Sequence, residues 1–236
     1  GGITQAPPEY QPGFIAWLAR KVKDVVDVPV IAVGRFNDPA LADEVIGRGD
    51  ADLVAFGRQF LADPDFLIKA REGRSDEIRL CIACNQGCIE REMLGEGNIR
   101  CSINPETGQE TVYPQGPASE PKNVWVVGAG PAGLTAASEA DRLGHRVTLF
   151  ERSEKLGGQL CYACIPPHKD VYGKWMEWFI GQVEKTGVDI RRGTDVTAAL
   201  LREGTPEHVI LATGGESIML PIPGIERPNV CDAWQV

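Results

Sequence analysis

The chain has 236 residues and a formal net charge of −9, with 43% hydrophobic and 24% charged residues. This is ordinary globular composition, and the acidic balance argues against binding to nucleic acid, whose phosphates need basic surfaces. No apolar stretch approaches the roughly 18 residues that can span a bilayer, and the first residues do not resemble a signal peptide.

The amino-terminal third alternates between predicted helices and short apolar strands. Apolar residues form a helical stripe over 13–26, and the apolar runs at 30–33 and 51–56 are typical of buried parallel strands. An Asp-Pro pair follows each strand, at 38–39 and 63–64, and predicts a helix start with aspartate as the N-cap. The repetition of strand and helix predicts a parallel α/β fold.

Both predicted strands end in a glycine–arginine pair, Gly34-Arg35 and Gly57-Arg58. In a TIM barrel, the loops after strands seven and eight commonly bind phosphate through backbone N–H groups. An arginine guanidinium at such a place suits a phosphate dianion. The alternative is that each arginine pairs with a surface carboxylate.

Cys81, Cys84, Cys88 and Cys101 follow the spacing C-x2-C-x3-C-x12-C in a loop-rich stretch, 78–112. Three close thiolates and a distant fourth can hold an iron–sulfur cluster. Four thiolates also suit tetrahedral zinc, although zinc sites more often use two separated C-x2-C pairs. Bound metal explains the seven cysteines of the chain better than disulfides do, and it favours a reducing cytoplasm.

A proline-rich linker at 113–122 precedes a second predicted domain, which begins at Asn123. An apolar strand is followed there by a G-x-G-x-x-G turn and a helix, the arrangement that binds a dinucleotide pyrophosphate. Glu151 ends the next strand 18 residues after the third glycine, where a carboxylate can accept hydrogen bonds from a ribose. The turn consists of Gly128, Ala129, Gly130, Pro131, Ala132 and Gly133.

Two later features favour FAD over NAD in this domain. The Gly-Gly-Gln turn at 157–159 can lay backbone against a flat cofactor, and the apolar strand at 208–212 ends in Thr213-Gly214, like the ATG motif of two-dinucleotide flavoproteins.

Cys161 and Cys164 form a C-x-x-C pair that invites comparison with redox-active disulfides. The sequence favours the simpler interpretation, two half-buried thiols without a redox role.

These motifs together resemble a known family. The segments are PVIAVGRFNDPALADEVIGRGDADLVAFGRQFLADPDF, RLCIACNQGCI, VWVVGAGPAGLTAA, VTLFER and LGGQL. In this order they resemble 2,4-dienoyl-CoA reductase and 2-enoate reductase, which are NADH:flavin oxidoreductases related to trimethylamine dehydrogenase. The resemblance runs over nearly the whole chain, and IPPHK at 165–169 is closer to the enoate reductases than to the amine dehydrogenases.

The resemblance implies an α/β fold in four parts. Residues 1–77 would be the C-terminal portion of an FMN-binding TIM barrel, 78–112 a 4Fe–4S segment, 113–122 a linker and 123–236 a Rossmann-like FAD-binding domain. The residues that it assigns to cofactors are Gly34, Arg35, Gly57 and Arg58 for the FMN phosphate, the four clustered cysteines for 4Fe–4S, and Gly128, Gly130, Pro131, Ala132, Gly133, Glu151, Arg152, Gly158, Gln159, Thr213 and Gly214 for FAD.

The implied activity is reduction of the C=C bond of an unsaturated acid or acyl-CoA, with electrons passing from NAD(P)H through FAD, the cluster and FMN. An amine dehydrogenase and a non-catalytic electron-transfer module are the alternatives. No catalytic residue is assigned, because the proton donors of the family would precede Gly1 and its NAD(P) domain would follow Val236. We therefore expect a longer polypeptide, a homo-oligomer or another chain to complete the barrel.

Overall fold

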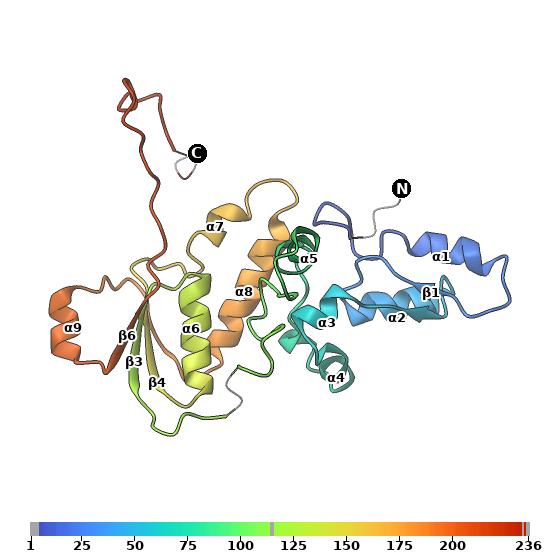
Figure 1. The fold of residues 1–236 in the computed structure, drawn as a ribbon, viewed down its shortest axis with the longest axis horizontal. Helices are drawn as coiled ribbons and strands as arrows, with labels where there is room; N and C mark the ends of the chain where they lie inside the picture. Colours follow the sequence, from blue (N-terminus) through green and yellow to red (C-terminus); the bar gives the residue numbers. More distant parts are fainter. Residues whose placement is uncertain (1–4, 114–115, 233, 235–236) are drawn as a thin grey trace. The chain divides into compact units, whose positions relative to one another are not determined.

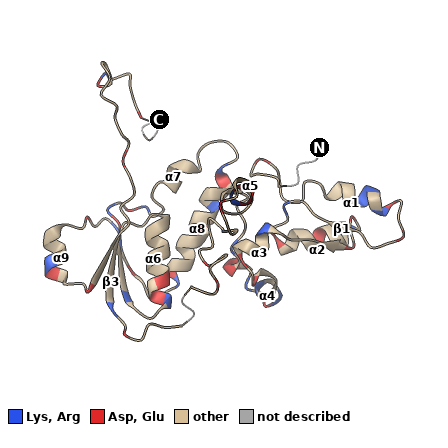
Figure 2. Cartoon of the chain, viewed as in Figure 1, with Lys and Arg blue, Asp and Glu red and all other residues tan. Residues whose placement is uncertain are grey.

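The computed structural model describes residues 5–113, 116–232 and 234 (Figure 1). The chain divides into two compact units, unit 1 (Gly1–Gln115) and unit 2 (Gly116–Val236). None of the described helices is both long enough and apolar enough to cross a membrane. Lysine, arginine, aspartate and glutamate are interspersed within both units (Figure 2). Many of these charges pair at short range, as Arg142 does with Glu139 at 2.7 Å, and exposed pairs of this kind stabilise little.

Unit 1 contains two short parallel strands and a series of helices. Its elements are, in chain order, α1 (Ala16–Lys23), β1 (Ile31–Ala32), α2 (Pro39–Gly47), β2 (Leu53–Val54), α3 (Arg58–Ala62), α4 (Phe66–Arg71), the 3-10 helix η1 (Ser75–Glu77), the π-helix η2 (Gln86–Glu90) and α5 (Arg91–Leu94). In the parallel register, Ile31 pairs with Leu53 and Ala32 with Val54. This β–α–β unit is the one that the sequence predicts.

Local signals explain where α2 begins and ends. The side chain of Asp38 accepts a hydrogen bond from the backbone N–H of Ala40 at 2.9 Å, as an N-cap does, and Pro39 is the first helical residue. Gly49, just beyond the end of the helix, has a φ of +74°. The second Asp-Pro pair behaves differently. The short helix α3 precedes it, and α4 begins only at Phe66. The side chain of Asp63 accepts a hydrogen bond from the N–H of Asp65 and so forms a turn between the two helices.

The core of unit 1 lies on one face of its small sheet. Ala32, Phe36 and Val45 are buried there. The expected apolar stripe over 13–26 is only partly realised, since α1 is shorter than predicted and Trp17 remains 55% exposed. The strands are likewise not buried on both faces, because Ile31 is 57% exposed. Two strands with helices packed on one side leave the other side uncovered.

Unit 2 is a parallel four-stranded sheet of order β5-β4-β3-β6. Its elements are β3 (Asn123–Val127), α6 (Pro131–Arg142), β4 (Arg146–Phe150), α7 (Leu160–Ala163), α8 (Asp170–Glu184), β5 (Asp189–Arg191), α9 (Ala198–Gly204) and β6 (His208–Leu211). The sequence predicts strands that begin at Asn123, end at Glu151, lie near 188–192 and span 208–212, and all four are present. The chain moves from β3 to β4 on one side and returns to β6 on the other side of β3, which creates a topological switch point.

Alternation along the strands separates the two faces of this sheet. Val124 and Val126 of β3 belong to the main core together with residues of α6 and α8. The intervening Trp125 faces the other way and contacts the ring of Phe150 at 4.7 Å between centroids. The third fingerprint glycine, Gly133, is buried in the first turn of α6. The apolar core thus holds α6 directly behind the turn that follows β3.

Candidate functional site

The four predicted metal ligands of unit 1 surround one small cavity. Its lining consists of Cys81, Cys84, Cys88 and Cys101 together with Arg58, Leu61, Ile82, Asn85, Gly87, Ser102 and Ile103. All four cysteines have free thiols. Within the described residues, no three histidine, cysteine, aspartate or glutamate side chains are arranged to hold a single metal ion.

The backbone between the first three cysteines is tightly folded. Ala83 and Asn85 have φ angles of +55° and +63°, in the left-handed region. The π-helix η2 follows and carries Cys88, whose side chain is buried. Such single-turn π-helices occur frequently at functional sites. These turns return the chain on itself, so that three cysteines within eight residues face the same cavity.

Gly87 brings the fourth cysteine to the site. Its carbonyl accepts from the N–H of Arg100 at 2.7 Å. A Cβ atom at this glycine would lie 2.9 Å from the backbone nitrogen of Ser102. Only glycine therefore allows Cys101 to approach the other three cysteines this closely. This residue was not predicted from the sequence, although a glycine between Cys84 and Cys88 was its signal.

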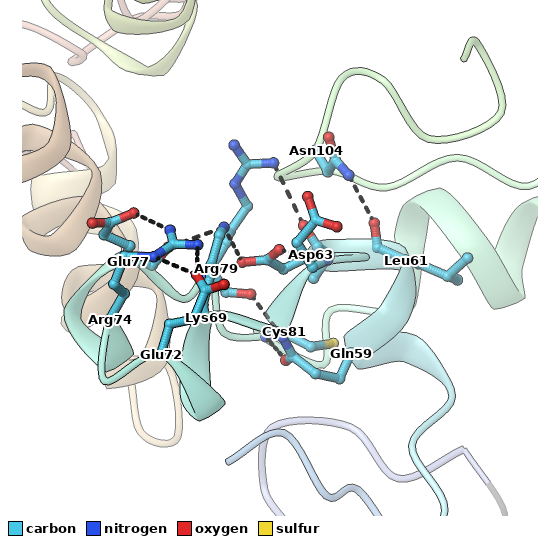
Figure 3. A network of polar contacts seen from close by, with 12 residues as sticks. Gln59, Leu61, Asp63, Lys69, Glu72, Arg74, Glu77, Arg79, Cys81 and Asn104 are labelled. Carbon is cyan, nitrogen blue, oxygen red and sulfur yellow. Dashed lines mark hydrogen bonds and ion pairs between the residues drawn. The ribbon is translucent and has the colours of Figure 1, made fainter. Parts of the chain in front are cut away.

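Two buried amides hold the backbone of Cys81, and Figure 3 shows one of them, Gln59. Gln59, which is 1% exposed, donates through Nε2 to the carbonyl of Arg79 at 3.0 Å and accepts through Oε1 from the N–H of Cys81 at 2.8 Å. Asn37 donates to the carbonyl of Cys81 at 3.0 Å. The side chain of Asn104 bonds in the same way to the carbonyl of Leu61. The cysteine segment is thereby fixed to the helices that follow β2.

The donor chemistry of this cavity fits a thiolate-ligated cluster. Burial raises the pKa of the Cys81 thiol to about 11 and also raises the pKa values of Cys88 and Cys101. Buried thiols of this kind are neutral at physiological pH until a metal displaces their protons. Four convergent sulfurs in a largely apolar lining are the ligand set that iron–sulfur clusters use.

The two glycine–arginine pairs follow β1 and β2, and their arginines lie at the same end of the sheet. Arg35 donates to the carbonyl of Pro8 at 3.0 Å, and Arg58 donates to the carbonyl of Ala6, also at 3.0 Å. Residues 6–8 therefore cross the carboxyl ends of the two strands. Gly34 adopts a φ of +150°, and a Cβ there would lie 2.5 Å from the side chain of Ile15.

Arg58 also lines the cysteine cavity. Its guanidinium donates to the side-chain oxygen of Asn85, in the loop between Cys84 and Cys88. Its positive charge favours the thiolate forms of Cys81 and Cys88. The sequence assigned this arginine to a phosphate alone, whereas the structure places it between the strand end and the four thiols.

The dinucleotide fingerprint of unit 2 has the geometry that its glycines require. Gly128 has a φ of +101°, and a Cβ there would overlap the carbonyl of Ala212 at the end of β6. Gly130 is the N-cap of α6, and Pro131 occupies the first turn of that helix. A Cβ at Gly133 would overlap the carbonyl oxygen of Gly128. The helix can therefore begin close enough to the strand to direct its N–H groups toward a bound anion.

Glu151 lies beside this turn at the end of β4. Its carboxylate accepts from the backbone N–H of Ala129 at 2.8 Å and from the N–H and hydroxyl of Ser153, both at 3.0 Å. A carboxylate has about four acceptor positions, so these bonds leave capacity for a ribose hydroxyl. Arg152, which the sequence also assigned to the cofactor, is exposed.

Two further segments meet the fingerprint at the same edge of the sheet. The N–H of Gly157 donates to the carbonyl of Ala129 at 2.9 Å, and a Cβ at Gly158 would lie 2.9 Å from the Cα of Gly130. Gln159 donates to the carbonyl of Gly215 at 3.1 Å, next to Thr213-Gly214. Candidate cofactor residues that span more than 80 positions in the sequence thus converge at the carboxyl ends of β3, β4 and β6, where doubly wound folds bind their ligands.

Two protein families match separate parts of the chain. Residues 6–77 match the NADH:flavin oxidoreductase / NADH oxidase family, and residues 123–211 match the family of FAD dependent oxidoreductases. These ranges contain the two glycine–arginine pairs and the dinucleotide fingerprint, respectively.

Longer proteins match nearly the whole chain. It is 41% identical over 233 residues to an NADH oxidase from Thermoanaerobacter brockii, covering 98% of this chain and 36% of that protein. It is 35% identical over 222 residues to a cinnamate reductase from Clostridium sporogenes, covering 94% of this chain and 33% of that protein. The chain therefore spans about a third of the length of these relatives.

A solved structure, a 2-naphthoyl-CoA reductase in complex with 2-naphthoyl-CoA, matches this fold with a TM-score of 0.91 and 31% identity. The match covers 100% of this chain and 36% of that one. It confirms the predicted α/β class, with part of a TIM barrel and a Rossmann-like FAD domain.

Proposed function

We propose that this chain, whose residues 6–77 match the NADH:flavin oxidoreductase / NADH oxidase family and whose residues 123–211 match the FAD dependent oxidoreductases, belongs to a flavin-dependent oxidoreductase. In this proposal it carries the 4Fe–4S site, the FAD site and part of the FMN site of an NAD(P)H-dependent reductase of activated C=C bonds. The observation that carries this proposal is the convergence of four thiols and an arginine on one cavity. Such a cavity next to a flavin-binding barrel end suits the transfer of single electrons between two flavins.

For the cluster, we propose Cys81, Cys84, Cys88 and Cys101 as the ligands. When bound, a 4Fe–4S cluster supplies one-electron transfer. The protein contributes the position of its ligands and the surrounding charge. Gln59 and Asn37 fix the first cysteine through its own N–H and C=O groups, and Gly87 admits the fourth.

The FMN phosphate is proposed to lie at the carboxyl ends of β1 and β2, against Gly34, Arg35, Gly57 and Arg58. Gly57 has open space where a Cβ would point, and it is the N-cap of α3. The carbonyls of residues 6–8 occupy part of the hydrogen-bonding capacity of the two arginines. A guanidinium has five N–H donors, so Arg58, whose bonds go to Ala6 and Asn85, retains donors for a phosphate.

FAD is proposed to occupy the edge of the unit 2 sheet where the fingerprint turn, Glu151, the turn at 157–159 and Thr213-Gly214 converge. The N-terminus of α6 would bind the pyrophosphate. Glu151 would accept from the adenosine ribose while it continues to hold the N–H of Ala129. The glycines at 128, 130 and 158 allow the backbone of these turns and of the segment after β6 to approach one another closely at this edge.

The proposed substrate is a small unsaturated acid or acyl-CoA, reduced with NAD(P)H as the electron source. The names of two similar proteins, a cinnamate reductase and a 2-naphthoyl-CoA reductase, support a conjugated C=C bond next to a carboxyl or thioester group. Turnover of cinnamate-type acids with NAD(P)H by the whole polypeptide would support a reductase. Oxidation of methylamines alone would instead assign the chain to an amine dehydrogenase.

The cluster assignment is tested by metal analysis. Anaerobically prepared protein should contain about four irons and four sulfides per chain, the content of one 4Fe–4S cluster. Changing Cys101 to serine should lower both contents, whereas the exposed Cys231 provides the matched control, and its change to serine should leave them unaltered. Stoichiometric zinc without sulfide in the same preparation would contradict the assignment.

A further inference from the structure

The C-x-x-C pair lies directly beside the proposed FAD site. Cys161 and Cys164 belong to α7 and to the residue that ends it, and α7 follows the Gly157-Gly158 turn. That turn is bonded to the fingerprint loop through the carbonyl of Ala129. The residue before α7, Gln159, reaches the end of β6. The two thiols are therefore attached to the same backbone turn that we assign to FAD.

Helix α8 packs against α7, and both sulfurs lie near this contact. The Sγ atom of Cys161 lies next to Gly157, where a Cβ would be 3.2 Å from this sulfur and 3.0 Å from Met176 of α8. The Sγ atom of Cys164 lies next to Gly173, one turn earlier in α8, where a Cβ would be 3.3 Å away. The absence of a side chain at Gly173 leaves the space that this second sulfur occupies.

The hydrogen bonds of the two sulfurs are weak and replaceable. Cys161 contacts the carbonyl of Leu156 and Cys164 contacts the carbonyl of Cys161, each at 3.5 Å from sulfur to oxygen. Both residues are intermediate in burial. Purely structural cysteines are commonly buried and unreactive. This pair differs from them, because it is neither enclosed in the core nor held by strong hydrogen bonds.

The helix that carries the pair can tighten to join the sulfurs. Residues at i and i+3 of a helix have Cβ atoms about 5–6 Å apart, whereas a disulfide needs about 3.5–4.5 Å. Helix α7 consists of a single turn, Leu160–Ala163, so a small local adjustment closes this gap. Disulfides that form under such strain have more oxidising potentials and are the reactive ones.

We propose that Cys161 and Cys164 form a second two-electron redox centre, a dithiol–disulfide pair that exchanges electrons with the FAD of unit 2. This inference rests on the proposed FAD site. In the oxidising direction, the two S–H bonds are lost and one S–S bond forms. The two electrons and two protons reduce FAD to FADH2. In the reverse direction, FADH2 reduces the disulfide to two thiols and returns to FAD.

The test is an anaerobic electron titration of the FAD-loaded chain with dithionite, after oxidation with glutathione disulfide. Wild-type protein should take up two electrons more per FAD than the Cys161→Ser/Cys164→Ser double variant. The matched control is Cys231→Ser, which removes an exposed thiol outside the pair and should titrate like wild type. Equal uptake by wild type and the double variant, both with bound FAD, overturns the proposal.

A second measurement on unaltered protein keeps the proposal testable if the double variant does not fold. Oxidised and dithionite-reduced samples of the wild type are alkylated and digested, and the masses of their peptides are measured by mass spectrometry. The proposal requires a linked Cys161–Cys164 peptide in the oxidised sample and two alkylated cysteines in the reduced one. Alkylation of both thiols in each sample refutes it. A chain that binds no flavin would instead refute the FAD assignment itself, so the two failures are distinguishable.

Discussion

Gln59 should control the stability of the cysteine segment, since one side chain satisfies two buried backbone groups. Changing it to leucine preserves the apolar volume but removes the bonds to the carbonyl of Arg79 and the N–H of Cys81. Each buried group left without a partner costs about 1–3 kcal/mol. The expected loss is therefore about 2–6 kcal/mol, a substantial part of the typical stability of a domain.

Amide hydrogen exchange measures this loss at the site itself, because the N–H of Cys81 is one of the two groups affected. A loss of about 2 kcal/mol corresponds to roughly 30-fold faster exchange through the open state. The matched control is Gln11→Leu, in an exposed position of the same unit, which should change stability by less than about 0.5 kcal/mol. Unchanged exchange at Cys81 in Gln59→Leu would refute the conclusion that this amide holds the segment.

Two further predictions concern unit 2. Gly133→Ala should abolish the cooperative unfolding of this unit, measured by tryptophan fluorescence, because the added Cβ would overlap the carbonyl of Gly128. Gly181→Ala in α8 is the control and should leave the transition intact, since no atom lies within 4 Å of the added carbon. Equal behaviour of the two variants would contradict the steric argument. The N–H of Asn123 holds the pKa of Glu207 below its usual value. The ionised carboxylate therefore stabilises unit 2 fully at pH values above the unfolded pKa of roughly 4.3. This contribution is lost as the pH falls through the lowered pKa of the folded state. In urea unfolding, the difference between Glu207→Gln and wild type should therefore be largest at pH 7 and should shrink as the pH is lowered below the unfolded pKa, and a difference that does not vary with pH would exclude this linkage.

Most secondary structure of the chain was predictable from local chemistry. The helix start at Asp38, the fingerprint turn and the four strands of unit 2 depend on residues close in sequence, so composition and periodicity reveal them. Helix α3 was missed, because its five residues are too few for a helical period to be recognised. The apolar stripe over 13–26 was predicted, yet periodicity states only which residues share a face and not what covers that face, and Trp17 is exposed.

The candidate sites divide in the same way. The spacing of the cysteines identified the ligand set, and the family resemblance was confirmed by the matches to known proteins. Gln59 and Gly87 were not predicted, because the groups that they serve lie elsewhere in the sequence, at 79–81 and 100–102. Arg58 was identified, but its position against the four thiols was not. The assignments of individual residues to FMN, FAD and the cluster remain predictions.

Features that depend on a residue and its immediate neighbours follow from the amino-acid order alone. These include glycines at positions that admit no Cβ, aspartate at a helix N-cap and thiols spaced for a shared ligand. Which distant segments meet depends instead on how the whole domain packs. Gly128 lies against the end of β6 because β6 pairs with β3 on the side opposite β4. Strand order is set by the combined burial of whole apolar faces, a property of the packed domain that no single motif encodes.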